Sequence, residues 1–338
     1  MGLKYPRDLD QWRQWQGRRH LLRTLKSSLS PTQRPSAVWH SVSDTPDIAI
    51  VLDSLTPSNR AALLTPLAFL PLDRVAVLAP AIATPHLPPA RWLASSVTTG
   101  PLLRDTVRSV LSAAHYLPLG ESAYAEAGQT GAHYHVIQHG LLTPFAPPLP
   151  PDASALVWSD QDGHFWQSGR TDVGSRTVGS QLLWEAGSIR AAAPEGPPVW
   201  LGQLHGAELP RAEMARAAEE FCRMTNARYR PHPAEQDRRS RRQHQRWAAA
   251  GIPLDLSGTR LSQMKAAVAS VFSTGVLEAA AMGLPAWVYH PAPPRWLSEF
   301  WDRYLMHPWG MSESTPEPPR DSLSPAEKVA LHLLEDIS

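Results

Sequence analysis

The turn Ser273-Thr274-Gly275 has the side chains and the setting of a phosphate-binding site. It follows a buried-strand pattern and precedes a helix pattern. The first amide groups of a helix have no partner within it and lie at its positive end, while hydroxyls add donors and glycine permits close approach. Glu278, one turn later, could meet a ribose hydroxyl. The alternative is that Ser273 only caps the helix and Glu278 is a solvated charge.

Two more short motifs lie, like this turn, at the ends of predicted strands. They are Gln138-His139-Gly140 and Arg230-Pro231-His232-Pro233. In open α/β sheets, ligands bind at the carboxyl ends of the strands. Each motif is weak alone, but their shared placement predicts a ligand site. His205-Gly206 also follows a strand pattern, and we interpret it as structural.

The elements that must position these motifs alternate between strand and helix. Strands are predicted at 47–53, 73–79, 134–138, 155–158, 176–180, 199–204, 227–233, 251–256, 268–272 and 286–289, and helices at 58–70, 103–115, 211–225, 236–249 and 325–337. This alternation is typical of an α/β fold with parallel sheets.

The pattern restarts near residue 198, which predicts two Rossmann-like domains. We expect a basic arm at 1–45, a first domain at 46–195, a second domain at 198–312 and a C-terminal helix at 320–338. A chain of 338 residues has room for two such cores.

The N-terminal arm carries eight basic side chains against two acidic ones in its first 35 residues. Trp12 and Trp15 fall within a predicted amphipathic helix at 9–25. One interpretation is a handle for an anionic membrane or a polyanionic acceptor. The other is a solvated arm that packs its tryptophans on the first domain.

The overall composition narrows the class of protein. A net charge of +1 provides no general attraction to nucleic acid or membrane. The single cysteine, Cys222, excludes an internal disulfide and a multi-cysteine zinc site. The N-terminus has no apolar signal-peptide core, and no apolar run reaches the ~20 residues of a membrane helix. We therefore expect a cytoplasmic protein, with any membrane contact peripheral on the inner face.

In this order, the three motifs resemble those of the GT-B glycosyltransferase superfamily. The nearest branches are bacterial surface-polymer enzymes: CDP-glycerol glycerophosphotransferases and the families that transfer Kdo or sialic acid. The resemblance covers residues 130–300 and implies two Rossmann-like domains facing a cleft. It also implies a metal-independent transferase without a cofactor. A glycosyl or polyol-phosphate group would move from a nucleotide-sugar or CDP-polyol donor to a hydroxyl of a glycan or lipid-linked acceptor, in cell-surface polysaccharide synthesis.

The resemblance also implies roles for individual residues. His139 would be the general base, with Asp162 as a rival, and Gly140 would let the substrate approach. The donor-binding residues would be Arg230 and His232 on the phosphates, Ser273, Thr274 and Gly275 on phosphate, and Glu278 on the ribose. The chain departs from these families in having Ser-Thr where a serine pair is usual, and Gln161 where a second acid precedes Asp162.

Other functions stay open at this stage. A sugar-nucleotide epimerase of the same fold also carries an Arg-Pro-His-Pro turn, but usually with an acid segment and paired glutamates that this chain lacks. The chain could also be a non-catalytic nucleotide-binding protein, or bind nucleic acid through the arm and residues 228–246. The near-zero net charge argues against nucleic acid. A GT-B enzyme would not require an Asp-x-Asp metal motif, so we predict no metal ligands.

Overall fold

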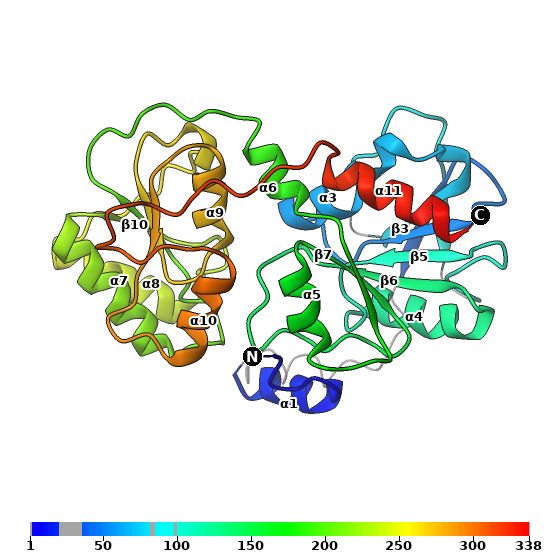
Figure 1. Cartoon of the computed structure of the whole chain (residues 1–338), viewed down its shortest axis with the longest axis horizontal. Helices are drawn as coiled ribbons and strands as arrows, with labels where there is room; N and C mark the ends of the chain where they lie inside the picture. Colours follow the sequence, from blue (N-terminus) through cyan, green and yellow to red (C-terminus); the bar gives the residue numbers. More distant parts are fainter. Residues whose placement is uncertain (1, 20–35, 82–84, 98–99, 338) are drawn as a thin grey trace. The chain divides into compact units, whose positions relative to one another are not determined.

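The chain forms two compact units, each with a sheet of its own (Figure 1). The computed structural model describes residues 2–19, 36–81, 85–97 and 100–337. The first unit is Met1–Leu182 with Asp321–Ser338, and the second is Leu183–Arg320. Both sheets are mainly or wholly parallel, so the expected α/β class with two parallel-sheet units is confirmed.

The first unit contains an eight-stranded sheet in the order β4-β1-β3-β2-β5-β6-β7-β8. Its strands are β1 (Ala37–Ser41), β2 (Ile48–Val51), β3 (Val75–Pro80), β4 (Leu93–Val97), β5 (Ser109–Ser112), β6 (His133–Ile137), β7 (Ser154–Val157) and β8 (Gly174–Thr177). The strands from β3 to β8 in this order pair in parallel. β1 is antiparallel to both of its neighbours and closes one side of the parallel region.

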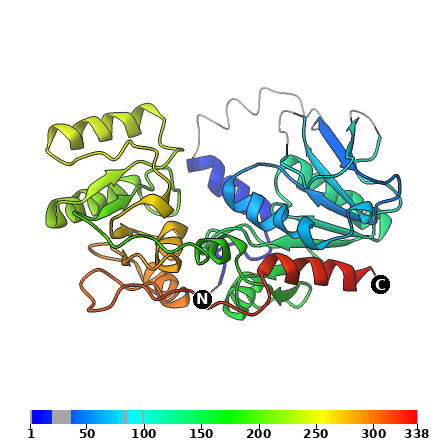
Figure 2. The same ribbon diagram turned by 90° about the horizontal axis from the view of Figure 1, so that it is seen from above.

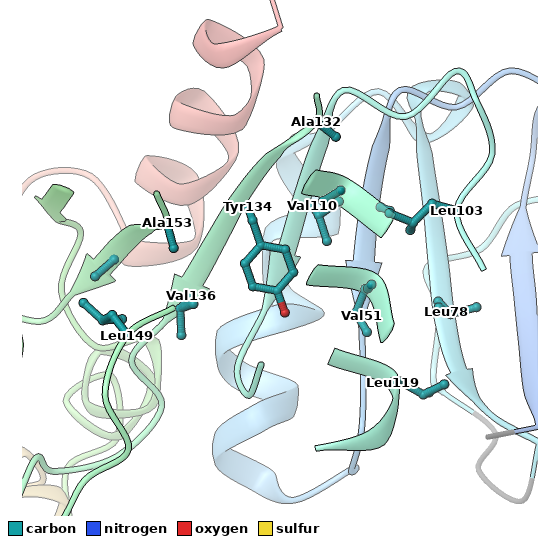
Figure 3. Packing of buried hydrophobic residues seen from close by; sticks show 14 of the residues in the cluster. Val51, Leu78, Leu103, Val110, Leu119, Ala132, Tyr134, Val136, Leu149 and Ala153 are labelled. Carbon is teal, nitrogen blue, oxygen red and sulfur yellow. The ribbon is translucent and has the colours of Figure 1, made fainter. Parts of the chain in front are cut away.

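The core of the first unit lies on both faces of this sheet. Side chains along each strand alternate between two clusters, one holding Val51, Leu78, Val110, Tyr134 and Val136, and the other holding Ile50, Val77, Leu111 and Ile137. Figure 3 shows the first cluster from close by. Burial on both faces explains why these strands are continuous apolar runs, with each fully buried aliphatic side chain contributing about 1.5–3 kcal/mol.

The helices of the first unit precede, separate and follow its strands along the chain. They are α1 (Leu9–Arg19), α3 (Pro57–Leu63), α4 (Pro118–Thr130), α5 (Asp160–Gln167), α6 (Gln181–Ala186), which leads into the second unit, and α11 (Pro325–Asp336). Thr56 and Ser159 cap α3 and α5 with side-chain oxygens. The start of α4 is capped from a distance, because the carboxylate of Asp53 accepts the amides of Leu119 and Gly120 at 2.8 and 2.9 Å.

The predicted helix at 103–115 is wrong. Residues 109–112 form β5, which is fully buried between β2 and β6. Hydrophobic periodicity cannot distinguish a buried strand from a buried helix in a short apolar run. Here pairing with the two neighbouring strands makes the segment a strand.

The α1 helix agrees with the predicted arm over 9–19, and its remaining residues, 20–25, lie outside the described residues. Trp12 is buried and donates from Nε1 to the Phe145 carbonyl at 2.8 Å. The Trp15 ring stacks on Phe145 at 4.8 Å. The tryptophans therefore pack on the first unit. Membrane contact by the arm stays a prediction, and no helix in the described ranges is long and apolar enough to span a bilayer.

The second unit contains a four-stranded parallel sheet in the order β10-β9-β11-β12. The strands are β9 (Val199–Leu201), β10 (Arg228–Arg230), β11 (Val268–Ser270) and β12 (Ala286–Val288), and the helices are α7 (Arg211–Thr225), α8 (Arg238–Ala249), α9 (Thr274–Ala281) and α10 (Arg295–Arg303). The strand expected at 251–256 is reduced to a single bridge between Tyr229 and Leu254.

The chain enters the second unit at Leu183, before the pattern restart near 198. The intervening segment is tied to the second unit by the amides of Ala191 and Glu195, which donate to the carbonyls of Met282 and Lys265. The C-terminal helix α11 returns to the first unit, where Val329, Ala330 and Leu333 join the second of its two clusters.

Candidate functional site

Three loops of the second unit meet at one edge of its sheet. They follow β9, β10 and β11, which are neighbours in the sheet and run in parallel. Their residues are 202–206, 231–235 and 271–273. Because carboxyl ends of parallel strands share an edge, two predicted motifs, at 230–233 and 273–275, lie at the same edge.

A pair of stacked imidazoles marks this edge. The rings of His205 and His232 lie with centroids 3.9 Å apart and planes 20° apart. His205 was interpreted from the sequence as structural, yet it is the direct neighbour of His232. Its placement after a predicted strand was the available signal, but only the strand order shows that β9 adjoins β10.

The hydrogen bonding of His232 fixes which nitrogen can donate. Its Nδ1 accepts the backbone N–H of Ala234 at 3.1 Å. Burial lowers the pKa of His232, although the nearby Glu235 opposes this, so the ring is neutral near pH 7. A neutral ring that accepts at Nδ1 carries its proton on Nε2. The His232 ring is packed against His205 on one face but the residue keeps exposed surface, so it presents an N–H donor.

Glu235 holds the loops after β9 and β10 together. The side chain is buried, and its carboxylate accepts from the amide of Leu204 at 2.9 Å and from the hydroxyl of Tyr229 at 2.8 Å. His244 of α8 donates to it from Nε2 at 2.9 Å. A fully bonded buried carboxylate of this kind fixes the backbone on which the two imidazoles stand.

Gln203 ties the third loop to the same edge. Its side-chain oxygen accepts from the Ser270 hydroxyl at 2.8 Å and from the Phe272 amide at 3.0 Å. Phe272 directly precedes Ser273. The start of α9 is therefore held in register with the loop that carries His205.

At the start of α9, the structure supports parts of both interpretations of the turn. Ser273 caps the helix, since its hydroxyl accepts the Gly275 amide at 3.1 Å. A Cβ at Gly275 would lie 2.6 Å from a methyl of Leu201, so a larger residue here would have to displace this side chain of β9. Glu278 is half-buried, burial raises its pKa, and its carboxylate has no hydrogen bond or ion pair to any described residue.

Arg230 is engaged away from the imidazoles. Its guanidinium donates to the Thr259 carbonyl, contacts the sulfur of Met264 at 3.1 Å and lies 3.6 Å from Asp255. These contacts hold the 255–264 loop against β10. The geometry suits a positioning role better than direct contact with a phosphate.

In the first unit, His139 follows β6 and is half-buried. Burial lowers its pKa, while a hydrogen bond with the Ile137 carbonyl opposes this. One ring nitrogen therefore donates to the backbone and the other keeps its lone pair, as a general base requires. Gly140 beside it has open space, since a Cβ there would meet no heavy atom within 4 Å.

Asp162 supports the turn that carries His139 through a hydrogen bond with Gln138. The Asp162 side chain is fully buried, and its Oδ2 accepts from the Gln138 amide at 3.1 Å. The same amide donates to the Gly140 carbonyl at 3.1 Å, and Trp158 bonds both oxygens of Gln138 at 2.9 Å. A carboxylate without exposed surface does not reach a substrate, so Asp162 fits the role of a positioning residue.

A cavity of about 300 Å³ opens at the end of β12. Its walls include Tyr289, His290, Trp301, Asp302 and Trp309. The volume lies at the lower limit of small-molecule sites. Within the described ranges, no group of three or more His, Cys, Asp or Glu side chains is arranged to hold a metal ion.

Comparisons with known proteins show a distant structural likeness. No family model matches the chain, and no curated protein matches it. A solved structure from Listeria monocytogenes, provisionally assigned as a UDP-N-acetylglucosamine 2-epimerase, is similar with a TM-score of 0.46 and 12% identity. The match covers 87% of this chain and 88% of that one. That enzyme class is the alternative weighed from the sequence, and the likeness is too weak to decide the reaction.

Proposed function

We propose that the chain is an enzyme acting on a nucleotide-activated donor, whose phosphates bind at the strand ends of the second unit. The observation that carries this proposal is the stacked pair of His205 and His232, held beside the start of α9 by Glu235 and Gln203. Two rigidly held imidazoles and a helix start form a preorganised set of donors for an anion.

The proposed reaction transfers the donor's glycosyl or polyol-phosphate group to an acceptor hydroxyl. As the bond to the leaving nucleotide breaks, negative charge grows on its phosphate oxygen. The Nε2–H of His232 and the amide and hydroxyl of Thr274 would stabilise that charge. Glu278 would accept a hydrogen bond from the ribose.

The acceptor is activated in this proposal by His139 in the first unit. Its free imidazole nitrogen would take the hydroxyl proton, and the lowered pKa keeps the ring neutral and ready to accept it. Gln138 and Asp162 would hold the turn in position. A role in surface-glycan or surface-polymer synthesis at the inner face of the membrane is part of the proposal.

The nucleotide site is tested by binding. CMP, CDP, UDP and GDP would be titrated by calorimetry into the wild type and into His232→Ala, His205→Ala and His86→Ala. His86 is an exposed residue of the first unit and serves as the control. We expect one nucleotide to bind, with affinity about 10–100-fold weaker in either imidazole variant. No binding, or equal binding in all four proteins, would refute the site.

The reaction is tested separately. His139→Ala should lower kcat by about 10²–10⁴-fold with donor affinity unchanged, because the base acts on the acceptor. Incubating the cognate sugar nucleotide and following the sugar by NMR distinguishes the two reactions. Nucleotide release that requires an acceptor supports transfer. Inversion of a sugar carbon without an acceptor would overturn transfer and identify the epimerase.

A further inference from the structure

The α8 helix has one buried face and one strongly basic face. Ser240, His244 and Trp247 are buried against the second unit. The exposed side carries Arg238, Arg239, Arg241, Arg242 and Arg246. The helix contains no acidic residue in Arg238–Ala249, and Asp237 just before it is used as the N-cap, where it accepts the amides of Arg239 and Ser240.

None of these five arginines forms an ion pair with a described residue. Other surface arginines of the chain do so, such as Arg223 with Glu219 on α7 and Arg295 with Glu299 on α10. Five unneutralised guanidiniums on twelve residues repel one another and destabilise an isolated helix. The packing of Trp247 and the N-cap formed by Asp237 offset that cost. These contacts stabilise α8 despite the repulsion between its arginines.

The arginines are spread across the exposed face. At about 100° per residue, Arg238, Arg242 and Arg246 form a row along a helix about 18 Å long, while Arg239 and Arg241 lie on either side of it. Together they span an arc of about 160°, opposite the buried residues. Figure 2 shows α8, drawn in yellow-green, at the margin of the second unit.

We propose that this arginine face of α8 docks the protein on an anionic lipid surface, with the guanidiniums bound to phosphate head groups. A helix lying parallel to a plane of head groups can bring the row and both flanks into contact at once, and guanidinium matches phosphate oxygens in bidentate geometry. No large apolar side chain lies on this face of the helix. Binding is therefore electrostatic, without insertion, and sensitive to salt.

The same observations favour a membrane over a linear polyanion. A single strand of nucleic acid or a polymer chain contacts the central row and leaves the flanking arginines largely unused. Proteins that bind single strands also present aromatic rings for stacking, and the aromatic residue of α8, Trp247, is buried. The inference does not depend on the proposed transferase, and it concerns a surface distinct from the N-terminal arm.

The test is co-sedimentation of the full chain with vesicles of phosphatidylcholine alone or with about one-third phosphatidylglycerol. Two glutamine variants are compared, one at the row (Arg238, Arg242, Arg246) and one at the flanks (Arg239, Arg241). The control replaces Arg60 and Arg91, exposed arginines of the first unit. A lysine variant of the row keeps the charge.

We expect wild type to bind only the anionic vesicles and to be released by about 0.5 M NaCl. At about fivefold for each arginine lost, the row variant should weaken binding about 100-fold and the flank variant about 25-fold. The lysine and control variants should retain most binding. Unchanged binding in both glutamine variants would overturn the proposal. The proposal would also be overturned if the wild type bound an RNA homopolymer in preference to vesicles and the flank variant kept that RNA binding.

Discussion

At the scale of single residues, the proposed role of each histidine follows from the hydrogen bond that one ring nitrogen makes with the backbone. That bond decides whether the other nitrogen can donate or accept. His232 accepts at Nδ1 from the Ala234 amide and therefore donates at Nε2. His139 bonds the Ile137 carbonyl and therefore keeps a lone pair. The motifs were identified from the sequence, but these tautomers follow from backbone geometry that a sequence does not display.

Glu235 is the residue on which the second unit's site depends most. It accepts from Leu204, Tyr229 and His244 in a buried position. We expect Glu235→Ala to lower the free energy of unfolding by about 3–5 kcal/mol, because a buried partner is removed and three donors lose their acceptor. Urea denaturation measures the change. Glu195→Gln, at an exposed position, should stay within about 0.5 kcal/mol, and equal effects for the two variants would contradict the assignment.

Gly275 has a packing role that can be separated from any role in binding. Since its Cβ would lie 2.6 Å from a methyl of Leu201, Gly275→Ala should cost about 1–3 kcal/mol in unfolding free energy. Adding Leu201→Ala makes room for the new methyl. A double-mutant cycle should then show the two changes to be less damaging together than their sum, whereas strict additivity would exclude this contact.

At the scale of elements, the local sequence pattern correctly predicted the strands that end in motifs. It misassigned segments whose secondary structure depends on the strands beside them in the sheet. Residues 268–272 and 134–138 are apolar runs followed by polar turns, and both contain strands as predicted. Residues 109–112 look helical beside the apolar residues around them, yet they form a central strand because β2 and β6 pair with its two edges. The stacking of His205 on His232 was missed for the same reason.

The attachment of α11 is an element-scale contact with a pH dependence. His133 and His135 of β6 bond the Asp336 carboxylate at 2.7 and 3.0 Å. Burial would raise the pKa of Asp336, but these hydrogen bonds outweigh it and lower the pKa to about 2. Burial, together with the charges of His135 and Arg176, lowers the pKa of His332 to about 4.

Both shifts make the fold less stable in acid. A depressed pKa means that the unfolded chain binds the proton more readily, so the contribution of His332 is complete above pH 6.5 and is lost as pH falls through 4. That of Asp336 is complete above pH 3.8 and lost as pH falls through 2. We expect His332→Gln to flatten the fall in unfolding free energy between pH 6.5 and 4, measured by urea denaturation. A profile as steep as wild type would exclude His332 as a source. In this variant the unfolding free energy should still fall somewhat with pH, because other histidines also have a lowered pKa. They are His40, His115, His139, His232 and His290.

At the scale of the whole molecule, the chain places its proposed anion-binding donors and its candidate base in different units with separate cores. The sequence predicted two such units because the strand and helix pattern restarts. It did not predict that α11 returns to the first unit, since contact between residues 133 and 336 leaves no local signature. The two units can therefore respond separately to a ligand.

This separation leads to a prediction for the proposed nucleotide site. Hydrogen exchange followed by mass spectrometry, with and without the nucleotide identified by calorimetry, should show slower exchange in peptides covering 202–206, 231–235 and 273–278. These loops carry the proposed phosphate donors, and a bound ligand suppresses their local opening. Peptides over 138–140 should be unchanged by the nucleotide alone, because His139 is proposed to act on the acceptor. The His232→Ala variant, at the same ligand concentration, should lose most of the protection. Slowed exchange confined to the first unit would show that the nucleotide does not bind the second unit, contrary to the proposal. Protection that persists in the variant would show that the imidazole pair does not bind the nucleotide.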